Sequence, residues 1–137
     1  ASETDLAVSY LPFSPLLATS DYLSLHLPLT PESHYLIDAK ALQQMKPTAF
    51  LINTARGPIV DEQALYKALA TRQIAGAGLD VFEAEPYISP ALLQFKNVVT
   101  LPHIGSSSLE TRVKMGFMVM DNLLARFSGH NPPNMVD

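Results

Sequence analysis

The chain alternates short apolar runs with stretches in which apolar residues recur every three or four positions. The clearest apolar runs cover residues 22–27, 49–53, 75–80 and 97–101, and their lengths are typical of β-strands. Two of them show no polar alternation, a pattern typical of strands that are covered on both faces of a parallel sheet. A further strand is expected near residues 6–10. The pattern therefore predicts several short strands that need connecting elements between them.

Helix start signals lie between these runs. Asp38 precedes the helical stretch 39–45, and Asp61 precedes the stretch 62–70. An aspartate at this position caps a helix by accepting hydrogen bonds from free backbone N–H groups. Strands and helices in this order and at this spacing predict βαβ units, and therefore a parallel α/β sheet.

The last long element has the clearest helical pattern in the sequence. Ser107, followed three residues later by Glu110, forms a capping-box pattern. Gly129 and the prolines at 132–133 are expected to end the helix. An apolar stripe runs between these signals at alternating steps of four and three residues: Leu109, Val113, Gly116, Met120, Leu123 and Phe127. Because apolar residues 117–119 widen this stripe, the helix is predicted to be covered on more than one side.

Composition narrows the class of protein. Of the 137 residues, 16% are charged and 47% are hydrophobic, whereas about 25% of an average domain is charged, so we expect one well-buried unit. The lack of cysteine excludes disulfides, thiolate zinc sites and a cysteine nucleophile, and it fits a reducing cytoplasmic location. A net charge of −4 without a basic cluster argues against nucleic-acid partners. No apolar stretch is long enough for a membrane span, and membrane partners are not expected.

Polar side chains directly follow three of the predicted strands. Arg56 follows the strand at 49–53, Asp80 and Glu85 lie at and after the end of the strand at 75–80, and His103 follows the strand at 97–101. The carboxyl ends of parallel strands meet at one edge of the sheet, where ligands bind in open α/β folds. We therefore expect a guanidinium, carboxylates and an imidazole to converge at this edge.

These groups suit the interconversion of a keto acid and a hydroxy acid. Arg56 can hold a carboxylate through two parallel hydrogen bonds and polarise the neighbouring carbonyl. His103, supported by the carboxylate of Glu85, can donate a proton to the carbonyl oxygen during reduction and withdraw it during oxidation.

Five motifs occur in order along the chain. They are Ser-Asp at 20–21 with Leu-His-Leu-Pro-Leu-Thr at 25–30, Leu-Ile at 36–37, Asn-Thr-Ala-Arg-Gly at 53–57, Gly-Leu-Asp-Val-Phe at 78–82 with Glu-Pro at 85–86, and Leu-Pro-His-Ile-Gly at 101–105. In this order and spacing the chain resembles the D-isomer-specific 2-hydroxyacid dehydrogenases, in particular their glyoxylate/hydroxypyruvate reductase branch.

The resemblance implies an oxidoreductase that uses NAD or NADP to reduce a small 2-keto acid, and that works as a homodimer. It assigns substrate binding to Arg56, the acid/base role to His103 and support of the histidine to Glu85. No metal is implied. The residues implied to line the cofactor are Pro28, Thr54, Ala55, Arg56, Asp80, His103 and Gly105.

The resemblance also implies the fold and its division. It predicts a partial doubly wound (Rossmann-like) parallel sheet, the second half of a dinucleotide-binding domain, over residues 1–106. Residues 107–137 would form a C-terminal helix and tail that cross to the substrate domain. The Gly-x-Gly-x-x-Gly turn that holds the pyrophosphate is missing from the sequence. We therefore expect the chain to be the C-terminal portion of such an enzyme and to be inactive in isolation, with NAD or NADP undecided.

A second hypothesis is a catalytically inactive stand-alone α/β module that self-associates through a sheet edge and the apolar helix. Glu83 competes with Glu85 for the supporting role but is interpreted as a solvated loop charge. His26, His34 and His130 are interpreted as structural histidines, because none has a partner at metal-ligand spacing.

Overall fold

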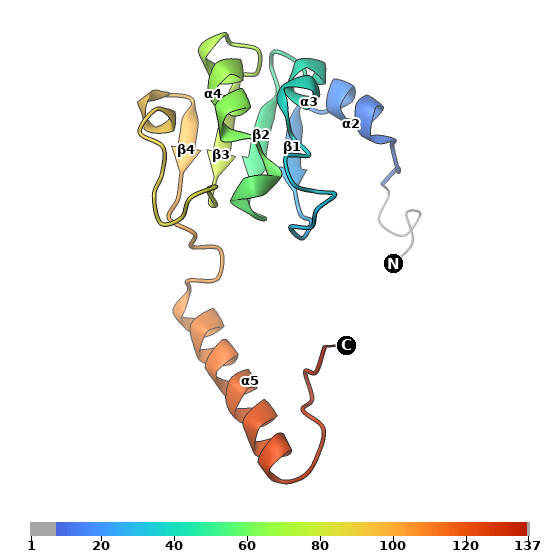
Figure 1. Cartoon of the computed structure of the whole chain (residues 1–137), viewed down its shortest axis with the longest axis vertical. Helices are drawn as coiled ribbons and strands as arrows, with labels where there is room; N and C mark the ends of the chain where they lie inside the picture. The colour runs from blue at the N-terminus through green and yellow to red at the C-terminus, as the bar shows by residue number, and fades with distance from the viewer. Residues whose placement is uncertain (1–7, 137) are drawn as a thin grey trace. The chain divides into compact units, whose positions relative to one another are not determined.

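The computed structural model describes residues 8–136, and the chain divides into two compact units, Ala1–Pro102 and His103–Asp137. The first unit is a four-stranded sheet with helices (Figure 1). All neighbouring strands are parallel, and they lie in chain order. The predicted α/β fold with βαβ units is therefore confirmed. The elements of this unit are α2 (Phe13–Thr19), β1 (Tyr22–Leu25), α3 (Ala39–Gln44), β2 (Phe50–Asn53), η1 (Gly57–Ile59), α4 (Glu62–Ala70), β3 (Gly76–Leu79), η2 (Leu92–Gln94) and β4 (Val98–Thr100).

The predicted caps hold both connecting helices. The Asp38 carboxylate accepts a hydrogen bond from the Ala41 backbone N–H at 2.8 Å, and the Asp61 carboxylate accepts one from Ala64 N–H at 2.9 Å. Each cap satisfies a backbone donor that has no partner inside its helix. The two helices also pack against each other, and α3 packs against α2 as well. The helices therefore form one continuous layer.

Burial alternates along β1 and β2, so the expectation of two covered faces is wrong for these strands, whereas every residue of β3 is buried or half-buried. Leu23, Leu25 and Leu51 are buried, whereas Tyr22 on the opposite face is exposed and Phe50 beside it is half-buried. The strands follow one another in chain order, and right-handed crossovers then place the connecting helices on a single face. The described residues therefore form a core between the sheet and the helices on one of its faces.

Two elements near the amino terminus differ from the sequence prediction. The strand expected at 6–10 falls partly on residues outside the described range, and residues 8–10 are not in a strand. The helix α2 was not predicted. It begins after Pro12 and buries Leu17 completely, and a seven-residue helix with one buried side chain leaves almost no periodic signal.

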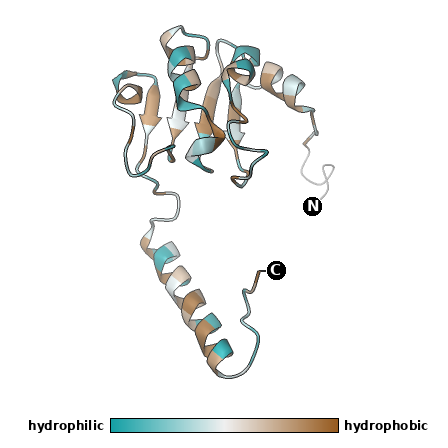
Figure 2. Ribbon diagram, in the orientation of Figure 1, coloured by the Kyte–Doolittle hydropathy of each residue, from teal (hydrophilic) through white to brown (hydrophobic). Residues whose placement is uncertain are grey.

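The second unit contains α5 (Leu109–Phe127). Its N-cap is Ser108 and not the predicted Ser107, because the Ser108 hydroxyl accepts the Thr111 backbone N–H at 3.2 Å. Gly129 follows the helix with φ +78, as expected for its end. No side chain of α5 is buried in the described chain, so the predicted cover is not present there. Much of the α5 ribbon has the colour of hydrophobic residues (Figure 2), and many of these residues have exposed side chains.

Candidate functional site

Three loops of the first unit leave the carboxyl ends of β1, β2 and β3. Because the strands are parallel, these loops emerge at the same edge of the sheet (Figure 1). The first loop carries Pro28, the second carries Arg56, and the third carries Glu85. The topology therefore brings together segments that are separated by tens of residues in the sequence.

A cavity of about 420 Å³ lies between the first two loops. It groups four of the residues predicted to contact cofactor or substrate, Pro28, Thr54, Ala55 and Arg56. Its remaining lining consists of His26, Leu27 and Leu29. The cavity combines an apolar wall with a hydroxyl and a guanidinium, which is the composition of a site for a small polar molecule with a flat apolar part.

Asn53 shapes the loop that carries Arg56. Its side chain is 1% exposed, its Oδ1 accepts the Ala55 backbone N–H at 3.1 Å, and its Nδ2 donates to the Arg56 carbonyl oxygen at 3.0 Å. The Arg56 side chain is exposed, and its Nη1 donates to the Ala55 carbonyl at 2.6 Å. A guanidinium has five N–H donors, so this contact leaves others that can bind a ligand.

Asn53 is the first residue of the motif at 53–57, but the motif alone does not predict its structural role. The available signal was an asparagine at the end of a strand and just before a turn, where its side chain often bonds to the backbone two residues later. Its burial could not be known from the sequence.

The loop after β3 carries the predicted carboxylates. Asp80 is buried, and its backbone N–H donates to the Asn53 carbonyl at 3.0 Å. Glu85 is exposed, and its Oε1 accepts the Phe82 backbone N–H at 3.1 Å. Both residues therefore lie on the strand end and loop next to the Arg56 segment.

Glu83 is not the solvated charge that the sequence suggested. It is half-buried, its Oε1 accepts the Glu62 backbone N–H at 2.8 Å, and its Oε2 accepts the Tyr35 hydroxyl at 3.2 Å. Neither Glu62 nor Tyr35 was predicted to take part, since they lie in other parts of the chain and only the tertiary structure brings them to Glu83.

His26 lines the cavity, although the sequence suggested a structural role. Its Nε2 lies 2.8 Å from the Ser24 hydroxyl. Ser33 fixes the same segment, because its hydroxyl donates to the Pro28 carbonyl and accepts the Thr30 backbone N–H, each at 2.8 Å. Residues 26–30 are therefore held by local hydrogen bonds.

The remaining predicted residues, His103 and Gly105, belong to the second unit. His103 has φ +53, a left-handed conformation that is uncommon for residues other than glycine. The Ser107 backbone N–H donates to the Ile104 carbonyl at 2.9 Å and closes a turn just after them.

Residues 8–136 contain neither a metal-binding cluster nor a helix that could span a membrane. No group of three or more His, Asp or Glu side chains there could hold a metal ion. None of the helices described has the length and apolar character of a membrane-spanning segment.

Comparison with known proteins gives a consistent result. Residues 1–105 match the family model described as "D-isomer specific 2-hydroxyacid dehydrogenase, NAD binding domain". A glyoxylate reductase of Thermococcus litoralis is 51% identical over 136 residues, which cover 99% of this chain and 41% of that protein. The chain thus spans about two fifths of the length of this curated relative.

Two solved structures bear on the cofactor. The NADPH-dependent glyoxylate/hydroxypyruvate reductase of Sinorhizobium meliloti, in complex with NADP and malonate, superposes with a TM-score of 0.88 at 43% identity, over 93% of this chain and 40% of that chain. The NAD-complexed form of a D-isomer specific 2-hydroxyacid dehydrogenase from Lactobacillus delbrueckii ssp. bulgaricus gives a TM-score of 0.89 at 33% identity, over 99% of this chain and 46% of that chain.

Proposed function

Because the chain belongs to the D-isomer specific 2-hydroxyacid dehydrogenases through their NAD binding domain, we propose that it supplies the nicotinamide side of an enzyme that reduces a small 2-keto acid. Glyoxylate and hydroxypyruvate are the proposed substrates, as in the names of the relatives. The observation that supports this proposal is the cavity lined by Arg56 together with Pro28, Thr54 and Ala55.

Arg56 binds the substrate carboxylate in this proposal. The side chain is exposed at the cavity, and its backbone is held by the buried Asn53. A guanidinium held at its base pairs with a carboxylate in a planar, two-bond geometry, and it also polarises an adjacent carbonyl. The positioning by Asn53 reduces the ordering cost of substrate binding.

His103 acts as the acid/base group, and Glu85 supports it. During reduction the imidazolium gives its proton to the carbonyl oxygen of the keto acid, and during oxidation the neutral imidazole takes that proton back. The left-handed backbone of His103 supports a specialised role, because such conformations cost energy and occur often at functional sites.

The residues present fit the nicotinamide end of a dinucleotide. Leu27, Pro28 and Leu29 give the cavity an apolar wall for a flat ring, and the Thr54 hydroxyl adds a polar contact. The buried carboxylate of Asp80 would meet the carboxamide. When bound, the cofactor supplies or accepts the hydride. Both NAD and NADP remain within the proposal.

A hybrid enzyme tests this function directly. The 137-residue chain replaces the matching 136-residue region of the Thermococcus litoralis glyoxylate reductase. We expect the hybrid to oxidise NADH or NADPH when glyoxylate or hydroxypyruvate is added. We expect the isolated chain to show no turnover, because the pyrophosphate-binding turn is missing from it. A folded hybrid without activity would contradict the proposed function.

Substitutions in the hybrid test the individual roles. His103→Ala should lower kcat by roughly 100- to 10,000-fold, whereas His130→Ala, which removes an imidazole from the tail, should leave it unchanged. Arg56→Ala should lower kcat/KM about 10- to 100-fold, through a higher KM from the lost carboxylate contact and a lower kcat from the lost polarisation of the carbonyl, whereas Arg126→Ala should not. Equal effects of target and control variants would refute the assigned roles.

We also propose that the enzyme is a homodimer. The exposed apolar side chains of α5, which include Phe117, Leu124 and Phe127, support this, since apolar patches on such a helix favour association. Sedimentation equilibrium of the hybrid should give twice the monomer mass, and a concentration-independent monomer would contradict the proposal.

A further inference from the structure

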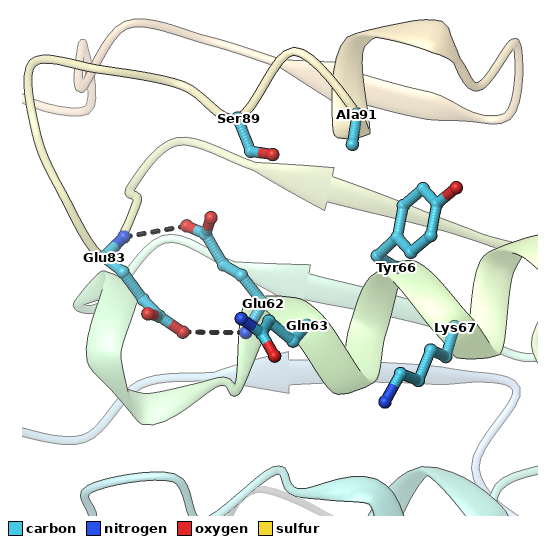
Figure 3. Close-up of a pocket in the computed structure, with 7 residues that line it drawn as sticks. All are labelled: Glu62, Gln63, Tyr66, Lys67, Glu83, Ser89 and Ala91. Atoms are coloured by element: carbon cyan, nitrogen blue, oxygen red, sulfur yellow. Dashed lines mark hydrogen bonds between the residues drawn. The ribbon is translucent and has the colours of Figure 1, made fainter.

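Two glutamates, one at the start of α4 and one in the loop after β3, bond reciprocally to each other's backbone. The Glu62 backbone N–H donates to Glu83 Oε1, and the Glu83 backbone N–H donates to Glu62 Oε1, both at 2.8 Å (Figure 3). Glu62 is the first residue of α4, and Glu83 lies in the loop after β3. This pair of bonds joins the start of a helix to a loop that lies 21 residues further along the chain.

Tyr35 adds a further segment of the chain to this arrangement. Its hydroxyl donates to Glu83 Oε2 at 3.2 Å, and its backbone N–H donates to the Pro58 carbonyl at 2.8 Å. Tyr35 has φ +52, a conformation that is unfavourable for an aromatic residue and persists only where surrounding contacts impose it. The surrounding structure therefore holds Tyr35 between the Pro58 turn and Glu83.

Gly57 allows the turn that contains it to contact the backbone of the loop that contains Glu83. A Cβ built at Gly57 would lie 2.0 Å from the carbonyl carbon and oxygen of Phe82 and 2.5 Å from the backbone nitrogen of Glu83. Only a residue without a side chain allows this approach. The turn that contains Gly57 and the loop that contains Glu83 are therefore packed against each other without a gap.

The Gly57 turn and the Glu83 loop each carry one residue of the proposed site next to their backbone contact. Arg56 immediately precedes Gly57, and Glu85, two residues after Glu83, accepts the Phe82 backbone N–H. We infer that Glu62 and Glu83 are positioning residues, whose reciprocal hydrogen bonds hold the Arg56 turn and the Glu85 loop in one fixed relation. This inference rests on the roles proposed above for Arg56 and Glu85.

The acceptor oxygens, and not the charges, carry this positioning. Burial raises the pKa of Glu62, the hydrogen bond from the Glu83 backbone lowers it, and the Glu83 charge raises it further. The two negative charges therefore oppose each other, while each Oε1 atom satisfies a backbone donor. A glutamine retains that oxygen and removes the charge, so it should replace either glutamate, whereas alanine should not.

Amide exchange on the 137-residue chain tests the positioning without any assay of activity. Glu83→Ala should lower the protection of the Glu62 amide about tenfold or more and shift the backbone NMR signals of Arg56 and Glu85. Glu83→Gln should restore both. Tyr35→Phe, which removes only the hydroxyl, should shift the same signals less. Gln63→Ala, one residue further along the helix, is the control and should change neither.

The hybrid enzyme then tests the consequence for catalysis. Glu83→Ala should lower kcat/KM about tenfold, with a higher KM for glyoxylate and a lower kcat, and Glu83→Gln should recover most of the loss. A merely structural role would lower thermal stability without a change in KM. Amide protection that is unchanged by Glu83→Ala, or not restored by Glu83→Gln, would overturn the inference. If the parent hybrid is inactive, the proposed function fails, and the exchange data still decide whether the two glutamates fix these loops.

Discussion

The two units of this chain use their apolar residues in opposite ways. In the first unit, Leu42, Leu51 and Leu65 are fully buried between the sheet and its helices. In the second unit, α5 is as rich in apolar side chains, yet none of them is buried in the described chain, and Phe127 is 83% exposed. Burial of apolar area is the main favourable term in folding. The first unit therefore contains its own source of stability, whereas α5 lacks one among the described residues.

The residues of the proposed site are also divided between these two units. The Arg56 loop rests on the buried Asn53 and on Gly57, which lies against the Phe82 backbone. His103 and Gly105 belong to the second unit, in which none of the described residues is buried. We expect the Arg56 side of the site to be formed in the isolated chain, and the His103 side to require the parts of the enzyme that cover α5.

A core substitution gives the largest expected contrast between the units. Leu51→Ala removes a side chain that is 0% exposed in β2 and should lower the free energy of unfolding by about 2–5 kcal/mol. Leu123→Ala in α5, where the side chain is 50% exposed, should change it by less than about 0.5 kcal/mol. Urea unfolding of the 137-residue chain, followed by circular dichroism, measures both. Similar losses in the two variants would show that α5 is packed in solution.

A matched pair of glycine substitutions tests the loop junction. Gly57→Ala places a methyl group against the Phe82 backbone and should cost about 1–3 kcal/mol through forced movement of both loops. Gly116→Ala, where an added Cβ meets nothing within 4 Å, should instead favour helix formation in α5 by up to about 1 kcal/mol. The thermal unfolding midpoint of the first unit should therefore fall for Gly57→Ala alone, whereas Gly116→Ala should raise the helicity of α5, and a harmless Gly57→Ala would contradict the close contact.

Removal of a helix cap should show whether a helix unfolds with the core or separately. Asp61→Ala removes the acceptor for Ala64 N–H and should lower the global stability of the first unit by about 1 kcal/mol. Ser108→Ala removes the acceptor for Thr111 N–H, and it should only increase local fraying at the start of α5. Amide exchange distinguishes the two outcomes, since a global loss reaches the sheet amides and a local one does not.

The smallest expected effect is on the pH dependence of stability. Its sign should be opposite for Glu62 in the first unit and Glu110 in the second. Burial holds the pKa of Glu62 above its ordinary 4.5, so its contribution to stability is present at low pH and is lost as pH rises through the raised value. Hydrogen bonds to the backbone N–H of Glu110 and to Ser108 lower the pKa of Glu110, so its contribution is present above 4.5 and is lost as pH falls.

The matched glutamine variants measure this difference. At neutral pH Glu62→Gln should raise the free energy of unfolding by less than about 0.5 kcal/mol, and Glu110→Gln should slightly reduce the helicity of α5. Both differences should vanish in acid. Unfolding curves at several pH values, with circular dichroism of the helix, provide the test, and a shift of the same sign in both variants would be inconsistent with the two environments.

Local patterns along the chain were sufficient for much of the fold. Residues close together in the sequence determine the strand positions, the helix caps at Asp38 and Asp61, and the end of the last helix at Gly129. These features can therefore be predicted directly from the sequence. The cap at Ser108 was misplaced by one residue, because adjacent serines offer equivalent hydroxyls and only the backbone conformation selects one of them. The single covered face of the sheet depends on the strand order, which apolar runs do not encode.

For the site, the sequence by itself determined the family and the identity of the chemical groups, because motifs of fixed spacing and residue type are read directly from the chain. The tertiary structure decided which of those groups meet. It assembled the cavity at Arg56 from two loops, it buried Asn53 beneath it, and it changed Glu83 from an apparent surface charge into the partner of Glu62 and Tyr35. These contacts join residues far apart in sequence, and their energies depend on burial and on hydrogen-bond geometry, which exist only after the chain has folded.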